Sequence, residues 1–574
     1  MAVFQLTSIR GEVQTIDEGV HLAAGVSYWH TGDFRLNEEH PPLVKLLAAL
    51  PVVLARPHIS YAIPSWQEGN QWAFARDLLY EQGNDADTLL ILGRLPMIAL
   101  SLTLGFVLYL WGRRLGGDLA GILTLGWYIF DPNFLAHGRY ITTDVSVTLA
   151  YAATLYALLR LLERWTWKRA LGFAVLFGLA QVTKFSALFL YAIILLVPAV
   201  WHIGKLPIKK LLQRTAAVFG LAVAGALVAI LLIYGGQVQK GANDPWITAQ
   251  YQERDAILAD NQLSQQPPTI QRVIRLTDPA TPTGRLVRKF TLETWIPSWS
   301  YFKGVVLVLN HDLWGHLAYL NGRHSNVGWW WYFPLAIAVK TPLATLIMLS
   351  LALVALARPS TRRHLLQQRG ISILLGACVL YLVWSLTSKL NLGVRHVFPF
   401  YSAVFVLVGI FLASVLRAGK PWLRLAVGGI VGLYVTSSIL AYPTYTAYFS
   451  EIVGGKPNGP RYLVDSNIDW GQDGKRLRAY LEKHAIPYVC MSYFGQANLA
   501  YYGLDTRYLP SENDPHAPKD IQCVVAISVS SLLSQDGAYA WLRQYEPDAR
   551  VGGSIYVYDF RKGRSPVKMQ KPFR

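Results

Sequence analysis

Two adjacent acidic residues near the start of the chain, Asp17 and Glu18, are the first residues whose types could support catalysis. A carboxylate in a partly desolvated site can act as a general base, because its pKa rises toward the working pH. The alternative is that the pair caps a helix beginning near Val20, where carboxylates face the positive end of the helix dipole. The catalytic interpretation is favoured by the motif that follows, His40-Pro41-Pro42-Leu43, whose prolines suit a helix start, and then by Lys45.

Basic residues within or beside apolar segments are the second chemical feature, because such cations can hold an anionic group such as a phosphate. Lys340 lies eleven residues past Trp329, which is about 16 Å along a helix. The alternative for Lys340 is that its side chain snorkels toward the membrane surface. Further candidates are Arg94, Arg139, Lys184 and Arg395, with His396 beside the last. For Arg139 and Arg395 the alternative is an ordinary loop charge, and for His396 it is a structural histidine.

The composition indicates that most of the chain lies in a membrane. Of the 574 residues, 53% are hydrophobic and 15% are charged, whereas soluble domains have about 25% charged residues. The mean hydropathy is +0.28. The net charge of +18 is concentrated in short loops between apolar segments, a distribution typical of cytoplasmic loops rather than of nucleic-acid binding. We therefore expect an α-helical polytopic membrane protein with no nucleic-acid partner.

About ten apolar segments predict membrane spans. When the segments are counted alternately, the loops richest in Arg and Lys all fall on one side, which is therefore cytoplasmic. These loops are 113–114, 163–169, 205–214, 358–369 and 417–424. The predicted spans are Leu89–Trp111, Leu119–Ala136, Asp144–Leu162, 170–182, 185–203, 215–234, Gly328–Ala357, 371–387, 397–416 and 424–442.

This topology divides the chain into three parts. Residues 1–88 form a first extracytoplasmic loop, and residues 89–442 form the membrane domain, which includes a long extracytoplasmic loop at 235–326. Residues 137–144, 388–396 and everything after 442 also lie outside the cytoplasm. Because the chain then starts outside without a preceding span, we expect one N-terminal span to be missing from this sequence, which would make eleven.

The tail, residues 443–574, predicts a small α/β domain on the extracytoplasmic side. Cys490 and Cys523 lie in its strand-like runs and could pair there, although two buried free thiols are the favoured interpretation. The polar stretch 462–473 either contacts an acceptor or forms a turn and helix cap. The predicted strands are Arg461–Asp465, Val489–Phe494, Val524–Val529 and Ser554–Tyr558, and the predicted helices are Gly474–His484 and Ala540–Tyr545.

The order of these motifs resembles a known family. The acidic pair followed by HPPLVKLL resembles the first extracytoplasmic loop of the protein O-mannosyltransferases, glycosyltransferase family 39. More broadly it resembles the GT-C superfamily of membrane glycosyltransferases, including the aminoarabinose transferase type. The segments AHGRYITTDVS (136–146), VTKFSAL (182–188), GWWWYFPLAIAVKTPL (328–343) and KLNLGVRHVFP (389–399) look like those of bacterial members.

The resemblance implies roles for particular residues. Asp17 corresponds to the catalytic base, and Asp144 corresponds to a second acidic residue at the outer end of a span. His40 follows the mannosyltransferase pattern, because aminoarabinose-type enzymes have a lysine there. The candidate catalytic residues are Asp17, Glu18 and Asp144, and the candidate ligands of substrate or carrier phosphate are His40, Lys45, Arg139, Lys184, Lys340, Arg395 and His396.

The function implied is transfer of a sugar, of hexosyl or mannosyl type, from a polyprenyl-phosphate donor to an extracytoplasmic hydroxyl, with inversion. The acceptor, whether glycan, lipid or protein, stays open. The location implied is the bacterial inner membrane, with lipid around the spans and the active site outside. The alternatives are a transporter or flippase of lipid-linked sugars and a non-catalytic scaffold. No cofactor is expected; the alternative is a divalent metal, for which His311, Asp312, His316 and His324 have no standard ligand spacing.

Overall fold

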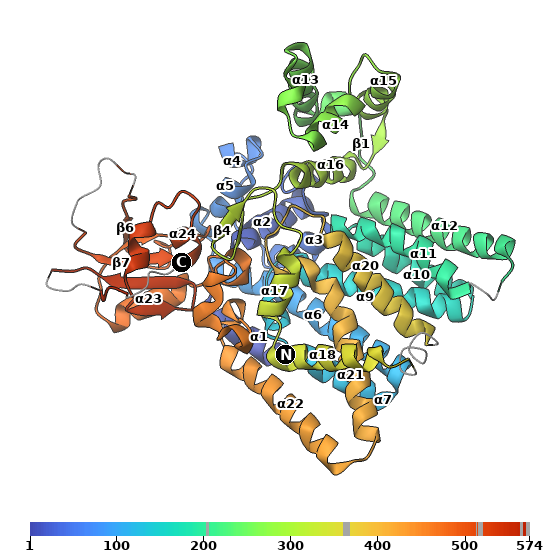
Figure 1. Ribbon diagram of the computed structural model, residues 1–574. Coiled ribbons are helices and arrows are strands. Elements are labelled where there is room, and N and C mark those ends of the chain that lie inside the picture. The colour runs from blue at the N-terminus through green and yellow to red at the C-terminus, as the bar shows by residue number, and fades with distance from the viewer. Residues whose placement is uncertain (203–205, 360–367, 513, 515–520, 563–565, 570–574) are drawn as a thin grey trace.

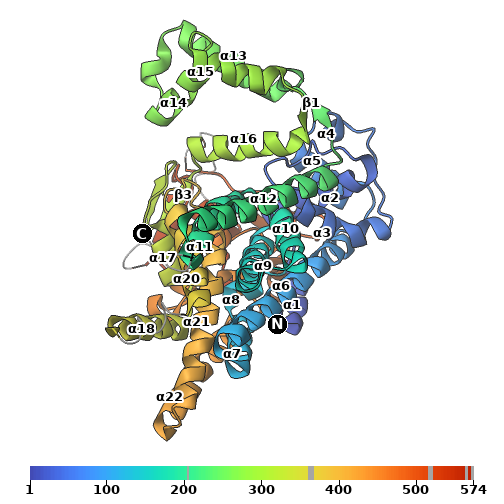
Figure 2. The ribbon, with the colours of Figure 1, turned by 90° about the vertical axis from the view of Figure 1, so that its right-hand side faces the viewer.

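The computed structural model describes residues 1–202, 206–359, 368–512, 514, 521–562 and 566–569. Most of the chain is helical, and a small sheet domain from its C-terminal part lies at one side of the helical body (Figure 1). Helices α13 to α15 of the long loop stand apart from this body in both views (Figures 1 and 2).

Several helices are long and apolar enough to cross a membrane. Among the described residues there are five, or up to six when one bent pair is counted as a single span. The chain is therefore a multi-pass membrane protein, although helix length alone does not reproduce the expected ten to eleven spans. The five are α6 (Ala86–Gly116), α9 (Asp144–Glu163), α12 (Ile208–Ile233), the combined 3-10 and α-helical segment Val394–Arg417, and α22 (Pro421–Ala441).

Two of the predicted spans are broken where a proline follows a polar residue. The predicted span Leu119–Ala136 divides into α7 (Asp118–Ile129) and α8 (Pro132–His137), because the Asp131 carboxylate accepts hydrogen bonds from the first backbone N–H groups of α8. The predicted span Gly328–Ala357 divides into α17 (Tyr332–Lys340) and α18 (Leu343–Ala357), and the direction of the chain bends by 117° between them. Pro342 lies at that break and cannot continue the helical hydrogen bonds.

The N-terminal part of the chain packs α2 (Ile16–Thr31) against α3 (Leu43–Leu54). Helix α3 begins directly after Pro42, as the proline pair predicts. The two helices approach closely at Gly25, where a Cβ atom would lie 2.2 Å from the Lys45 carbonyl oxygen. This packing fixes the start of α2, which carries Asp17, relative to the loop before α3.

Helix α16 (Trp299–Trp314) of the long loop contacts parts of the chain that are far from it in the sequence. Near its start, Lys303 forms ion pairs with Glu38, at 2.6 Å, and with Asp244, at 3.2 Å. Near its end, Asp312 accepts hydrogen bonds from the Ser388 hydroxyl and the Lys389 backbone. The rest of the loop holds α13 (Pro245–Ala259), α14 (Pro268–Leu276), α15 (Pro282–Arg288) and the hairpin of β3 (Ala318–Leu320) and β4 (Arg323–Ser325).

The C-terminal domain has a five-stranded sheet in the order β6-β5-β7-β9-β8. Strand β5 is parallel to β6 and β7, whereas β9 is antiparallel to β7 and β8. The predicted strand Arg461–Asp465 is wrong, because Pro460 and the positive φ of Asp465 interrupt any extended run. The elements are α23 (Gly474–Lys483), β5 (Val489–Ser492), β6 (Thr506–Tyr508), β7 (Val524–Ser528), α24 (Val529–Leu532), the 3-10 helix η12 (Ala540–Gln544), β8 (Ala549–Val551) and β9 (Ile555–Asp559).

Cys490 and Cys523 form a disulfide between neighbouring strand regions, with their Cα atoms 6.2 Å apart. The favoured interpretation of two free thiols is therefore wrong. Periodicity places each cysteine in a strand but does not show that β5 and β7 are neighbours in the sheet, which is what brings the two sulfur atoms together. Cys378 is buried and free.

Candidate active site

Asp144 lies at the centre of a cluster of charges that come from several elements of the chain. It is the first residue of α9, and its side chain is 1% exposed. Its Oδ1 atom is 2.5 Å from Lys184 Nζ, and its Oδ2 atom is 3.1 Å from Arg395 Nη1. Lys184 precedes the 3-10 helix η3 (Phe185–Phe189), and Arg395 belongs to the 3-10 helix η7 (Val394–Val397). One buried carboxylate thus holds two cations from different elements.

Asp17 faces the same cluster from the first turn of α2. Its Oδ2 atom is 3.4 Å from Arg395 Nη1, so that Arg395 connects Asp17 with Asp144. The Asp17 side chain is 26% exposed, in contrast to the buried Asp144. The carboxylate that is open to an incoming molecule is therefore that of Asp17.

Glu18 points away from this cluster although it is adjacent to Asp17. Its carboxylate accepts hydrogen bonds from Arg94 Nε, at 2.8 Å, and from Arg94 Nη2, at 2.7 Å. It also accepts from the backbone N–H groups of Thr15 and Ile141. The side chain is fully buried. The helix-capping interpretation therefore describes Glu18, and these bonds fix the start of α2 against α6.

Three histidines lie beside the charge cluster. His21 is hydrogen-bonded through Nδ1 to the Ile141 carbonyl oxygen, at 2.7 Å, and its ring meets that of His40 edge to face. Burial, followed by the positive charges of His21, Lys184 and Lys45, holds the pKa of His40 well below its usual value. The His40 ring is therefore neutral near pH 7. His396 packs its ring against Phe333.

Lys45 and Lys340, expected to bind a carrier phosphate, instead bind oxygen atoms of the protein. Lys45 Nζ donates to the carbonyl oxygens of Asn37 and His40, at 2.6 and 2.7 Å, and to the Tyr28 hydroxyl. It therefore holds the loop between α2 and α3. Lys340 Nζ donates to three backbone carbonyl oxygens, those of Thr446, Tyr448 and Asn467. Each lysine is 1% exposed, so neither is placed to meet an incoming phosphate.

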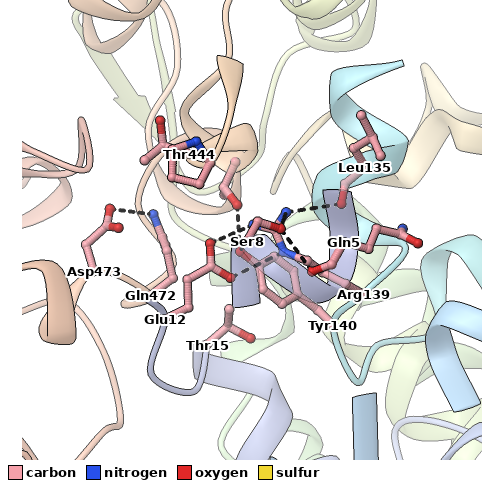
Figure 3. A network of polar contacts seen from close by, with 12 residues as sticks. Gln5, Ser8, Glu12, Thr15, Leu135, Arg139, Tyr140, Thr444, Gln472 and Asp473 are labelled. Carbon is pink, nitrogen blue, oxygen red and sulfur yellow. Dashed lines mark hydrogen bonds and ion pairs between the residues drawn. The ribbon is translucent and has the colours of Figure 1, made fainter. Parts of the chain in front are cut away.

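Arg139 lies in a buried network of polar contacts with Glu12, Ser8 and Leu135 (Figure 3). Its Nη2 atom is 2.6 Å from Glu12 Oε1, and its Nη1 atom donates to the Ser8 hydroxyl and the Leu135 carbonyl oxygen. Glu12 also pairs with Arg476 of α23. Arg139 is fully buried. Glu12 and its neighbours surround the guanidinium group, so this position does not favour the phosphate-binding role that the sequence predicts for Arg139.

The C-terminal domain contributes residues that sequence reasoning did not select. Arg395 Nε donates to the Ser466 hydroxyl at 3.2 Å, and the Arg395 guanidinium group lies over the Trp470 ring. The pKa of Asp465 is raised to about 6, chiefly by burial. The charge of Arg395 acts against this rise and the charge of Asp17 adds to it, so the Asp465 carboxyl group lies within electrostatic reach of both residues. The sequence feature that points to these residues is the polar stretch 462–473. From the sequence alone, this stretch could either contact an acceptor or form a turn and helix cap.

Among the residues that the structure describes, no group of three or more His, Cys, Asp and Glu side chains is placed to hold a metal ion. His311 and His316 approach each other, with Nε2 and Nδ1 3.2 Å apart. Asp312 is instead bonded to Ser388 and Lys389. The four residues considered for a metal thus do not form one site.

Residues 90–234 match the dolichyl-phosphate-mannose-protein mannosyltransferase family. The resemblance to GT-C membrane glycosyltransferases is confirmed there. The matched part is about a quarter of the chain and contains Asp144 and Lys184, whereas Asp17 and Arg395 lie outside it. The matched residues thus include Asp144 and Lys184 of the charge cluster. Arg395 and Asp17 join the cluster through the ion pairs that Arg395 forms with Asp144 and Asp17.

Two solved structures are similar to the chain over most of its length. ArnT from Cupriavidus metallidurans bound to undecaprenyl phosphate is 14% identical, with 97% of this chain and 96% of that chain covered and a TM-score of 0.45. The oligosaccharyltransferase AglB from Archaeoglobus fulgidus, in complex with an inhibitory peptide and a dolichol-phosphate, is 10% identical, with 99% and 74% covered and a TM-score of 0.43. No curated protein matches the sequence. The GT-C assignment therefore rests on residues 90–234.

Proposed function

We propose that the chain transfers a sugar from a polyprenyl-phosphate donor to a hydroxyl group of an extracytoplasmic acceptor. The observation that carries this proposal is the arrangement around Asp144, which pairs with Lys184 and Arg395, while Arg395 also contacts the partly exposed carboxylate of Asp17. A cation pair next to an open carboxylate suits a reaction in which an anionic group departs while a proton is removed.

In the proposed reaction, Asp17 accepts the proton of the acceptor hydroxyl. The hydroxyl oxygen forms a bond to the anomeric carbon, and the bond from that carbon to the phosphate oxygen breaks. The electron pair of the broken bond stays with the polyprenyl phosphate, which gains one negative charge. Attack opposite to the leaving group inverts the anomeric configuration, as the family resemblance implies.

Lys184 and Arg395 would receive the departing phosphate. Their side chains are 14% and 10% exposed, so part of each cation remains open. The hydrogen bonds that Arg395 makes to other described residues use Nε and Nη1, which leaves Nη2 for an anionic oxygen. Asp144 would act as a positioning residue, because it holds both cations and is itself buried.

An extracytoplasmic location of the site and of the C-terminal domain in the bacterial inner membrane is part of the proposal. The Cys490–Cys523 disulfide supports it, because disulfides persist in oxidising compartments and are rare in the cytoplasm. The gathering of Arg and Lys in a few short loops also supports it, because such loops are typically cytoplasmic. The proposed mechanism uses only side chains of this chain and requires no cofactor.

The experiment that tests the proposal is sugar transfer by membranes that carry the chain. These membranes would be given a panel of labelled polyprenyl-phosphate sugars, and membranes without the chain would serve as the control. We expect one donor to be consumed, with release of free polyprenyl phosphate and appearance of a labelled product.

A flippase would give a different result with the same panel. It would move the labelled donor across the membrane without breaking the bond between sugar and phosphate. Translocation without release of polyprenyl phosphate from any donor would therefore contradict the transferase and support the transporter.

A further inference from the structure

The segment Asp465–Gln472 of the C-terminal domain contacts Arg395 on two sides. The Arg395 guanidinium carbon lies 4.2 Å from the centre of the Trp470 ring, and Trp470 is 2% exposed. Arg395 Nε donates to the Ser466 hydroxyl at 3.2 Å, and this hydroxyl donates to the Leu392 carbonyl oxygen at 2.6 Å. The Ser466 oxygen is thus oriented to accept from Arg395. Both contacts restrict the direction in which the guanidinium group points.

The same segment is bonded to the start of the Asp17 helix. The Ile16 backbone N–H donates to the Trp470 carbonyl oxygen at 3.1 Å, and the Val13 backbone N–H donates to the Gln472 carbonyl oxygen at 3.0 Å. Ile16 immediately precedes Asp17. Trp470 therefore contacts the Asp17 helix through its backbone and Arg395 through its ring.

Asp465 holds the beginning of this segment in a specific conformation. Its φ angle is +57°, a left-handed conformation that residues other than glycine adopt infrequently. Its carbonyl oxygen accepts from the backbone N–H groups of Ile468 and Asp469, and its carboxylate accepts from the Ser466 N–H. Asp469 in turn accepts from the backbone of Ser530 in α24. These bonds give the segment a fixed shape supported by the sheet domain.

We infer that Trp470 and Ser466 are positioning residues that hold Arg395 in the direction needed for a phosphate oxygen, so that the C-terminal domain completes the active site. This inference rests on the proposed function of Arg395 as a phosphate ligand. Arg395 Nη1 lies 3.1 Å from Asp144 Oδ2 and 3.4 Å from Asp17 Oδ2. Without the contacts to Trp470 and Ser466, the guanidinium group would turn further toward one of these two carboxylates. A buried ring face and a fixed hydroxyl keep Nη2 available.

The test measures binding of undecaprenyl phosphate to the purified full-length protein. We expect Trp470→Leu to weaken binding by about 10- to 30-fold, because a desolvated cation–π contact is lost. Trp470→Phe retains an aromatic face and should recover most of the affinity. The matched control is Trp541→Leu, the same change at a half-buried tryptophan of the same domain that packs against Tyr545 and Phe560.

A double-mutant cycle separates positioning of Arg395 from a general structural effect. In an Arg395→Met background, Trp470→Leu should have no further effect on undecaprenyl phosphate binding. An equal loss of affinity in both backgrounds, or a loss no greater than that of Trp541→Leu, would overturn the inference. If Trp470→Leu does not fold, Ser466→Ala replaces it in the same cycle, with an expected loss of about tenfold.

The outcomes also distinguish this inference from the proposed function. If the wild-type protein turns over no donor while the cycle shows coupling, the transfer proposal fails and the positioning role stands. If the wild-type protein transfers sugar while the cycle shows no coupling, only the positioning role fails. If the wild-type protein neither transfers sugar from any donor of the panel nor binds undecaprenyl phosphate, both fail.

Discussion

Replacing Asp17 with asparagine is expected to lower the rate of sugar transfer by about 10²- to 10⁴-fold, the range typical of a lost general base. The amide has almost the same shape but cannot accept the proton of the acceptor hydroxyl. Binding of the donor should persist, because Lys184 and Arg395 remain in place. The measurement is the initial rate of transfer from the active donor, together with the affinity for undecaprenyl phosphate.

The matched control for this change is Asp33→Asn. Asp33 lies just after α2, its side chain is 31% exposed against 26% for Asp17, and it pairs with Arg35 outside the charge cluster. This control should transfer sugar at the wild-type rate. Substantial activity in Asp17→Asn would show that another group removes the proton, and parallel losses in both variants would indicate a general effect on the first loop.

The second large effect concerns stability. Arg139→Met should lower the free energy of unfolding by about 3–5 kcal/mol, because it leaves the buried Glu12 carboxylate without its closest partner. The measurement is the unfolding transition in detergent. The affinity of the folded fraction for undecaprenyl phosphate should stay unchanged, because the Arg139 guanidinium group is fully buried and bonded to Glu12, Ser8 and Leu135 (Figure 3).

Arg114→Met provides the comparison. Arg114 pairs with Glu163 at 2.7 Å, but its side chain is 46% exposed, and exposed pairs contribute at most about 1 kcal/mol. A loss of phosphate affinity in Arg139→Met without a loss of stability would restore the phosphate-binding role that the sequence predicts for Arg139.

The sequence selected several residues that the structure brings together in the candidate site, but it did not separate cations that remain partly exposed from cations that are enclosed by the protein. Lys184 and Arg395 meet at Asp144, as a common site requires. Lys45 and Lys340 are equally unusual in the sequence, yet they are surrounded by backbone carbonyl oxygens. Carbonyl groups occur at every position, so nothing in the residue types indicates which lysine they surround.

Adjacent acidic residues posed a similar problem. Asp17 and Glu18 are neighbours in the sequence, but successive residues of a helix point in directions about 100° apart. The first turn of α2 directs Asp17 toward Arg395 and Glu18 toward Arg94. The capping interpretation therefore describes Glu18, whereas the catalytic role of Asp17 stays a prediction, and the packing of α2 against α6 gives the two side chains these different surroundings.

The fold was predictable where hydrophobic pattern dominates and less so where single residues interrupt it. Helix α9 and the segment Val394–Arg417 lie close to the predicted spans. The breaks before Pro132 and at Pro342 depend on one proline each within long apolar runs. The contacts of Trp470 were not predictable, because they join residues far apart in the sequence.

The bonds from Val13 and Ile16 to Gln472 and Trp470 set the order in which the site can form during synthesis. A ribosome adds about 5–20 residues per second, so Trp470 follows Asp17 by about 20 to 90 s. During that interval the Ile16 N–H has no Trp470 carbonyl to bond, and Arg395, once made, has no aromatic face beneath it. The newly made chain therefore completes the candidate site only after all of the candidate membrane helices that the structure describes have been synthesised.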